Sequence, residues 1–322
     1  MDRGLTDVLI HRSDRTTPRY VCAAETERVF RTSDLIASGA SRAHITQLRR
    51  ESEQLRPGVW VPKDMEPRAR YDALSRAVLA DLQPRAMLTG PTAACLLGMP
   101  LPNVPLLQVF VRGIPRGAYG GDVKVVGDEV PAIVHQGLRV AEPAVVVADC
   151  ARWLSVRDCL SIADRATHQG LCRAEDLVRV AKEFSGRRGA HRVRWIAEHV
   201  DPAAESPGET WTRIVLQMLG YSPRSQVVVG DGERTARLDF LLEDSRTAVE
   251  FDGLVKYAGV ADVASEKDRQ AWLESLGYVV VRILWKHLLD PDQIARRLRQ
   301  LGVAPSGRRL ALPVGWHVVD PS

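Results

Sequence analysis

The feature that most constrains the fold is a pair of apolar segments that carry carboxylates, between Arg237 and Gly253 in RLDFLLEDSRTAVEFDG. Asp239 lies in the first segment, and Glu250 and Asp252 lie in the second. Segments so rich in Leu, Val and Phe are typical of half-buried or fully buried strands. A buried carboxylate is costly unless it is paired, hydrogen-bonded or bound to a metal. The fold must therefore supply partners for these acids.

These segments belong to an alternating unit that begins after the Pro- and acid-rich stretch DPAAESPGET. A helix is expected over residues 208–221, strands over 225–230, 237–242 and 247–253, a charged helix over 266–278, and a strand over 279–285. This order predicts a small α/β unit. Side chains two apart project to one face of a strand, so Glu250 and Asp252 share a face, and Asp239 can join them from a neighbouring strand.

Clustered carboxylates repel one another unless a cation lies between them, and an all-oxygen site suits Mg²⁺ or Mn²⁺. Such ions hold a phosphate and activate a water, as phosphodiester hydrolysis requires. Lys256 follows Asp252 by four residues and could polarise the water or the phosphate. The alternative is a surface hairpin whose acids face solvent, which the apolar neighbours disfavour. We therefore expect Asp239, Glu250 and Asp252 to be metal ligands.

The motifs RLDFLL, AVEFDG, KY, EKDRQ and LGYVVVRILW occur in this order over residues 206–290. They resemble the very-short-patch-repair-like (Vsr-like) branch of the PD-(D/E)XK nuclease superfamily. The resemblance implies a restriction-endonuclease-like mixed sheet flanked by helices, with a Mg²⁺-dependent active site. It also implies that Asp239 is the superfamily's aspartate and that Glu250 is the acid of its ExK pair. Glu209 corresponds to the glutamate of the preceding helix.

One position departs from the pattern of that superfamily. Asp252 stands two residues after Glu250, where the superfamily has a lysine. The resemblance therefore leaves the proton-handling residue open. Lys256 and Lys267 are the candidates, and Lys256 is the better placed of the two.

Residues 32–62 have the pattern of two short helices followed by a ribbon, after a helix expected to close over residues 26–30. The first of the two is expected to be capped by Thr32 or Ser33 and to turn Leu35 and Ile36 inward. Glycine at the end of this helix and the Pro-Gly turn in QLRPGVWVPK predict a helix stop and a hairpin.

The second of these helices is expected to begin at Ser41 and to turn Ile45 and Leu48 towards the core. Its other face presents polar and basic side chains: Arg42, His44, Thr46, Gln47, Arg49 and Arg50. The order helix, turn, helix and wing is typical of DNA-binding domains. Side chains of these types contact phosphates and base edges in such domains. A solvated helix surface in a small bundle remains the alternative.

The motifs RTSDLIASGASRAHITQLRR, LRPGVWVP and LTGPTAACLLGMPLP lie within residues 25–150. They resemble the AbiEi family of type IV antitoxins, which join a winged helix-turn-helix to a regulatory domain. The resemblance implies DNA recognition without catalytic residues in this part of the chain. Within the middle region, AVVVADCARWL (residues 144–154) is expected as a strand that leads into a helix.

Composition narrows the class of protein further. The five cysteines are scattered without a CxxC pair, which favours reduced thiols over disulfides or a zinc ribbon. No apolar run approaches a membrane span, and the N-terminus lacks the apolar core of a signal peptide. We therefore expect a cytoplasmic protein without a membrane partner. The net charge of +4 is too mild to prove a nucleic-acid partner.

These patterns predict a multi-domain α/β protein. The expected parts are a winged helix-turn-helix over residues 1–70, an α+β regulatory or connecting domain over 71–200, a nuclease domain over 206–300 and a C-terminal tail over 301–322. The expected function is a Mg²⁺-dependent endonuclease on double-stranded DNA, in phage defence or DNA repair. The rival is a transcriptional regulator or antitoxin whose nuclease-like domain does not cleave, and action on RNA is a weaker third. The sequence leaves open whether the chain is a monomer or a homodimer.

Overall fold

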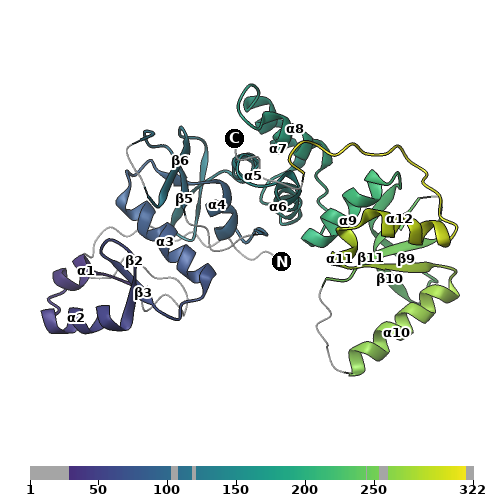
Figure 1. Ribbon diagram of the computed structural model, residues 1–322, viewed down its shortest axis with the longest axis horizontal. Helices are drawn as coiled ribbons and strands as arrows, with labels where there is room; N and C mark the ends of the chain where they lie inside the picture. Colours follow the sequence, from purple (N-terminus) through teal and green to yellow (C-terminus); the bar gives the residue numbers. More distant parts are fainter. Residues whose placement is uncertain (1–28, 103–107, 118–120, 244, 254–259, 317–322) are drawn as a thin grey trace.

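The computed structural model describes residues 29–102, 108–117, 121–243, 245–253 and 260–316. Three units, each with its own sheet, follow one another along the chain and lie in a row (Figure 1). The protein is therefore a multi-domain α/β chain. No helix within these ranges is both long enough and apolar enough to cross a membrane.

The first unit packs two short helices against a small antiparallel sheet with strand order β1-β3-β2. Its elements are β1 (Phe30–Arg31), α1 (Thr32–Ala37), α2 (Arg42–Glu51), β2 (Ser52–Arg56) and β3 (Val59–Pro62). The expected start of α2 is confirmed, because Ser41 Oγ accepts a hydrogen bond from the backbone N of His44 at 3.2 Å. Ile45 is buried as predicted, and the hairpin turns at Gly58, which has a φ of 77°.

Three expectations for this unit were wrong. Phe30 lies in β1 rather than in a helix, while residues 26–28 lie outside the described residues. Ile36 is 62% exposed, whereas its neighbour Leu35 is half-buried. Arg31 takes the N-cap position of α1, and no side chain caps this helix.

The middle unit contains a mixed sheet of order β6-β5-β4-β8-β7 and a group of helices. Its elements are α3 (Pro67–Asp81), β4 (Met87–Leu88), α4 (Gly90–Leu96), β5 (Val109–Arg112), β6 (Val123–Gly127), β7 (Ala132–His135), β8 (Leu138–Ala141), α5 (Pro143–Cys150), α6 (Val156–His168), α7 (Ala174–Glu183) and α8 (Ala190–His199). After the sheet, α6, α7 and α8 follow one another without an intervening strand.

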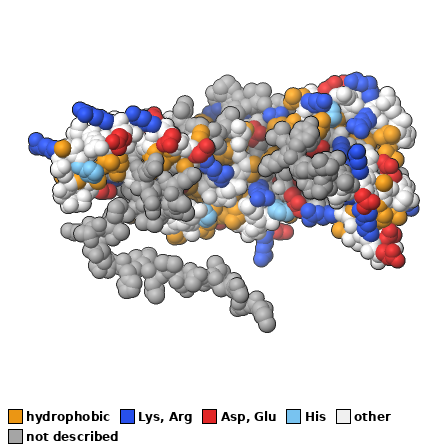
Figure 2. All heavy atoms as spheres, turned by 90° about the horizontal axis from the view of Figure 1, so that it is seen from below, with side chains coloured by type: hydrophobic (Ala, Val, Ile, Leu, Met, Phe, Trp, Pro, Cys, Tyr) orange, Lys and Arg blue, Asp and Glu red, His pale blue; other side chains and the backbone are white. Residues whose placement is uncertain are grey.

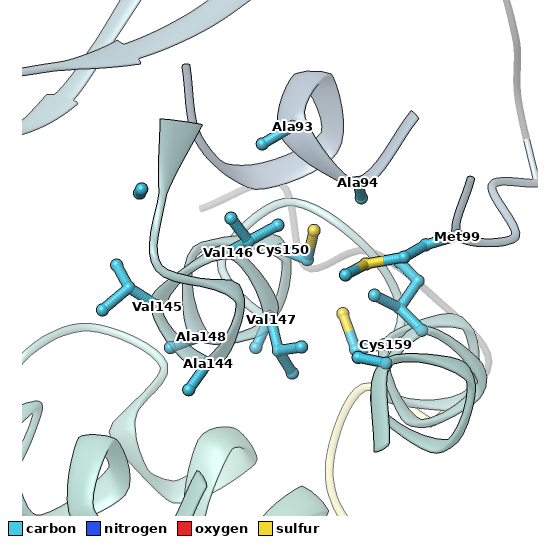
Figure 3. Close-up of a cluster of buried hydrophobic side chains, with 14 of the residues drawn as sticks. Ala93, Ala94, Met99, Ala144, Val145, Val146, Val147, Ala148, Cys150 and Cys159 are labelled. Carbon is cyan, nitrogen blue, oxygen red and sulfur yellow. The ribbon is translucent and has the colours of Figure 1, made fainter. Parts of the chain in front are cut away.

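The segment AVVVADC was expected as a strand, and this was wrong, because it forms α5. Pro143 occupies the first turn, where its missing N–H costs nothing. Val145, Val146 and Val147 surround the helix axis and are all buried, so tertiary packing overrides their β preference (Figure 3). Figure 3 also shows the thiol of Cys150 beside Met99 in this core, as expected for a small buried thiol.

The third unit is built on a mixed sheet of order β12-β11-β10-β9. Its elements are α9 (Pro207–Met218), β9 (Pro223–Gly230), β10 (Thr235–Leu242), β11 (Thr247–Phe251), α10 (Val260–Ser275), β12 (Val279–Ile283), α11 (Trp285–Leu288) and α12 (Pro291–Gln300). The predicted element order is confirmed. Leu273 of α10 packs on one face of the sheet, and Leu216 of α9 and Leu298 of α12 pack on the other.

Residues 301–316, expected as a tail, return to the middle unit along the path drawn in yellow in Figure 1. The backbone N of Val156, at the start of α6, donates to the O of Gly315 at 2.9 Å. Trp316 is buried in the core of the middle unit, where its ring meets Trp195 edge-on at 5.7 Å. This segment therefore ties the third unit to the second.

Candidate active site

A row of polar residues crosses the apolar sheet of the third unit. The antiparallel register of β9 and β10 pairs Leu238 with Val227 and Phe240 with Ser225, so Gln226 falls across from Asp239. The β10–β11 register, continued by one residue, sets Asp239 across from Glu250. The parallel β11–β12 ladder pairs Glu250 with Arg282. Each of the four strands thus contributes one polar residue at the same level, so the acids predicted from their apolar surroundings are neighbours.

Asp239 is half-buried, and its Oδ2 accepts a hydrogen bond from the backbone N of Phe251 at 2.8 Å. The pKa of its carboxyl is raised to about 6, mainly by burial and in part by the negative charges of Glu209 and Glu250. The hydrogen bond from Phe251 and the charge of Arg269 act in the opposite direction. The fold therefore holds Asp239 near other carboxylates, and these surroundings destabilise its ionised form relative to its protonated form.

Glu250 is paired with Arg269 of α10 through both of its carboxylate oxygens. Arg269 Nη2 lies 2.6 Å from Oε1, and Nη1 lies 3.2 Å from Oε2. A bidentate guanidinium–carboxylate pair is among the stronger polar contacts in proteins. Arg269 thus neutralises the one acid of the row that faces α10, and any metal cation has to compete with it for Glu250.

Glu209 lies at the start of α9 and is almost fully buried. Its Oε1 accepts from Ser206 Oγ at 2.7 Å, and its Oε2 accepts from the backbone N of Glu205 at 3.0 Å. Oε2 also accepts from Nε2 of Gln226 at 2.9 Å. Ser206 in turn caps the helix, so the side chain of Glu209 is both part of a helix cap and part of the acidic cluster.

Of the other expected site residues, Asp252 follows the end of β11, and its backbone N donates to the O of Ile283 at 2.8 Å. Lys256 lies outside the described residues, and Lys267 is exposed on α10. In the part of the chain that the structure describes, no three or more His, Cys, Asp or Glu side chains form a group that could hold a metal ion. The expected trio of Asp239, Glu250 and Asp252 is therefore not assembled as one metal centre in this conformation.

At the level of Asp239, the side chains of β10 no longer alternate regularly between the two faces of the sheet. Leu238 packs in the cluster against α10, whereas Phe240, two residues later, packs in the cluster on the opposite face. In an undistorted strand these two side chains would share a face. Across the ladder, Gln226 has a φ of 52°. Asp239 therefore sits at a local distortion of both strands.

Sequence reasoning missed Gln226, Arg269 and Arg282 as members of this cluster. Arg282 interrupts the apolar strand VVVRILW in the same way that Asp239 and Glu250 interrupt theirs, so the same rule could have found it. Its guanidinium bonds Glu266 on α10, which also pairs with Arg269. Gln226 carries no comparable signal, because neutral polar residues are common on strands.

A buried ion pair joins the candidate site to the middle unit. Asp164 of α6 accepts hydrogen bonds at Oδ2 from Arg213 Nη2 at 3.0 Å and from Thr210 Oγ1 at 2.8 Å. The pKa of Asp164 is raised to about 6, because the effect of burial outweighs the opposing charge of Arg213. Thr210 is the neighbour of Glu209, so this pair anchors the helix end that carries the glutamate. A pocket of about 390 Å³, lined in part by Ser206 and Thr210, opens at the same junction.

The residues predicted to contact DNA are exposed on α2. Among them, Arg49 also contacts other residues of the first unit. Arg49 Nη2 donates to Thr32 Oγ1 at 3.0 Å, and its guanidinium lies 5.2 Å from the ring centre of Trp60. The expected set is exposed as a whole: Arg42, His44, Thr46, Gln47, Arg49 and Arg50. Figure 2 shows Lys and Arg side chains projecting from the end of the molecule that this first unit forms.

Comparison with known proteins gives relatives without an assigned activity. No family model matches the chain. Two uncharacterized proteins from two strains of Mycobacterium tuberculosis are each 28% identical to it over 212 residues. Each match covers 64% of this chain and 78% of the relative. The argument for function therefore rests on the residues of the candidate site.

Proposed function

We propose that the protein is a DNA-binding endonuclease that depends on Mg²⁺ or Mn²⁺ and hydrolyses phosphodiester bonds. The observation that carries this proposal is the polar row through the apolar sheet, in which Asp239 lies across from Glu250 and within the electrostatic influence of both Glu250 and Glu209. Carboxylates in such surroundings need a cation or another partner. The third unit, with its mixed sheet between helices, agrees with a restriction-endonuclease-like fold, which we also propose.

The donor set suits a hard divalent cation, because all of its members offer oxygen. Asp239 and Glu250 would hold the ion, with Asp252 at its water and Glu209 beside it. The Oε1 atom of Gln226 is a buried oxygen that accepts no hydrogen bond from any described residue, so it can accept from a further donor. When bound, such an ion supplies an activated water and stabilises a leaving oxygen.

Arginine side chains can prepare this site for a phosphate group. Arg269 neutralises Glu250, and a cation that takes Glu250 would leave the guanidinium available to a negatively charged substrate. Guanidinium groups match phosphate oxygens in a bidentate geometry. Lys256 remains the proposed residue for proton handling, with the exposed Lys267 as the second candidate.

For the first unit we propose a winged helix-turn-helix, with α2 as the recognition helix and the β2–β3 hairpin as the wing. The exposed polar face of α2 and the buried Ile45 on its other side support this assignment. A helix of ten residues that presents Arg, His and Gln fits the major groove of DNA.

We expect the double substitution of Arg42 and Arg50 by Ala to weaken binding to duplex DNA and to flatten its salt dependence. Each lost phosphate contact lowers the log–log salt slope by about 0.9. Fluorescence anisotropy over a salt series measures both effects. Adding Arg49→Ala should weaken binding further, although that side chain also contacts Trp60. Replacing Lys182 and Arg194, two exposed cations of the middle unit, is the control of equal charge. Affinity that is unchanged in the triple variant excludes α2 from DNA binding.

Cleavage is tested directly with the purified full-length chain. Plasmid DNA, single-stranded DNA and RNA are each incubated with Mg²⁺, with Mn²⁺ or with EDTA. We expect cleavage of duplex DNA with either metal and none with EDTA, and the ratio of nicked to linear plasmid shows whether one or both strands are cut. Cleavage of RNA alone would replace DNA as the substrate. No cleavage of any substrate with either metal would exclude the nuclease.

A second function has its own support. The bidentate Arg269–Glu250 pair satisfies the acid without a metal, and no described group of carboxylates is assembled to hold one. Both observations favour a transcriptional regulator or type IV antitoxin-like protein in which the nuclease-like unit does not cleave. In that case residues 71–200 would be the regulatory domain, and promoter DNA would bind to the first unit without being cut.

A further inference from the structure

Guanidinium groups gather beside β6, an edge strand of the sheet in the middle unit. The carbonyl oxygen of Val126 accepts a hydrogen bond from Nη1 of Arg152 at 3.0 Å, and Nη2 of Arg116 lies 3.5 Å from the same oxygen. A Cβ built on Gly189, the N-cap residue of α8, would lie 3.6 Å from Cγ of Arg152, so the turn that carries Arg188 also packs here. These three side chains, Arg116, Arg152 and Arg188, form an arginine cluster from distant parts of the chain.

The carboxylate that faces this cluster is already paired with another arginine. Oδ1 of Asp149 lies 3.9 Å from Nη1 of Arg152. Both oxygens of Asp149 accept from the buried Arg112, at 2.6 Å from Nε and 2.8 Å from Nη2. Within the described ranges, no carboxylate forms an ion pair with Arg116 or Arg188. The arginine cluster therefore carries positive charge that the described part of the chain does not neutralise.

The charges of the arginines act on one another. The pKa of Arg152 is lowered, mainly by burial, and the charge of Asp149 opposes this effect. Three positive neighbours lower it further: Arg112, Arg116 and Arg188. Like charges at short range disfavour each other, and an anion between them relieves the repulsion. Arg116 and Arg188 are exposed, and the side chain of Arg152 is 23% exposed, so an anion in solution can reach all three.

We propose that the arginine cluster is a second DNA-binding surface, which contacts the phosphate backbone of the duplex that α2 binds. This inference rests on the proposed function. Guanidinium groups match phosphate oxygens, and the contact with Val126 already orients Arg152. Exposed arginines from separate segments suit a chain of phosphates, whereas a small ligand is usually enclosed in a pocket. Phosphate contacts carry no direct base readout, so the cluster positions the duplex and does not select its sequence.

The test measures the salt dependence of binding to a linear duplex by fluorescence anisotropy, with the full-length protein in EDTA so that the DNA stays intact. The double variant Arg116→Ala and Arg188→Ala is expected to bind more weakly. Its log–log salt slope should fall by about 0.9 for each phosphate contact that is lost. The double variant Arg116→Lys and Arg188→Lys keeps both charges and should keep the slope of the wild type.

Lys182 of α7 and Arg194 of α8 provide the matched control, because both are exposed cations of the same unit outside the cluster. Replacing both by Ala removes the same charge, and we expect the salt slope of the wild type. The side chains changed in all of these variants are exposed, so their melting temperatures should equal that of the wild type.

Three results would overturn the inference. If the Ala variant of the cluster keeps the salt slope of the wild type, the cluster does not contact DNA, while binding by α2 stands. If the Lys182 and Arg194 control loses as much slope as the cluster variant, the effect belongs to net charge and not to this surface. If the wild type binds no duplex at all, the inference falls together with the proposed DNA binding.

Discussion

Asp239→Asn is expected to lower metal-dependent cleavage by at least about 100-fold, the lower end of what one electrostatic group of an active site contributes. The substitution removes the charge that would hold the cation but keeps an oxygen that can accept from the backbone N of Phe251. DNA binding by the first unit should be unchanged. Plasmid cleavage and anisotropy measure the two effects. Cleavage that persists in this variant would assign the acids to structure.

The same variant has a second readout in the pH dependence of stability. Because the pKa of Asp239 is raised to about 6 from 3.8, the folded state binds its proton more tightly than the unfolded state does. The contribution of this group is therefore full below about pH 4 and is lost as the pH rises through about 6. Asp239→Asn should remove this loss, which is on the order of 2 kcal/mol. Urea unfolding of both proteins at pH 4 and pH 7.5 measures it.

Glu250→Gln should abolish cleavage as well, but with a different effect on stability. The simple expectation that removing an acid relieves repulsion does not hold here, because Arg269 loses its bidentate partner. We therefore expect the metal-free melting temperature to fall in Glu250→Gln and to stay equal or rise in Asp239→Asn. Asp268→Asn is the control for both, since its exposed side chain pairs with Arg234 away from the row.

The second large effect is expected at the junction of the middle and third units. Asp164→Ala removes the nearer of two carboxylates beside Arg213, whose side chain is only 6% exposed, and leaves Asp201 at 3.4 Å from its Nε. Breaking a buried pair costs about 3–5 kcal/mol, and the remaining Asp201 sets the expected loss at the lower end of that range. The measurement is urea unfolding at pH 8, where Asp164, with a pKa of about 6, is ionised. A cost below about 1 kcal/mol would mean that the junction does not depend on this pair.

Two further variants separate charge from packing at this junction. Asp164→Leu combined with Arg213→Met replaces both charges by apolar groups and should recover most of the lost stability. Glu183→Ala breaks a surface pair with Arg179, in which both side chains are largely exposed, and should cost less than about 1 kcal/mol. Equal losses in Asp164→Ala and Glu183→Ala would contradict the assignment of a buried pair.

The sequence was sufficient for the elements whose local signals agreed with their surroundings. Ser41 as a cap and Ile45 as a core residue followed from the pattern of α2. The strands that carry Asp239 and Glu250 followed from apolar runs, and their acids stood out because a charge in such a run needs a partner. Where local preference and packing disagreed, packing prevailed, as in the valines of α5, which form a buried helix.

Only the tertiary structure decided which partners the acids have. Arg269 and Glu209 reach the row from two different helices, and nothing in their spacing along the chain predicts contact with Glu250 or Gln226. The return of residues 301–316 to the middle unit is likewise invisible in the sequence. Local patterns report periodicity and burial, whereas ion pairs between distant segments depend on how the elements pack. The sequence by itself therefore determined that charged groups lie inside this sheet, and the packing of helices around the sheet decided what neutralises them.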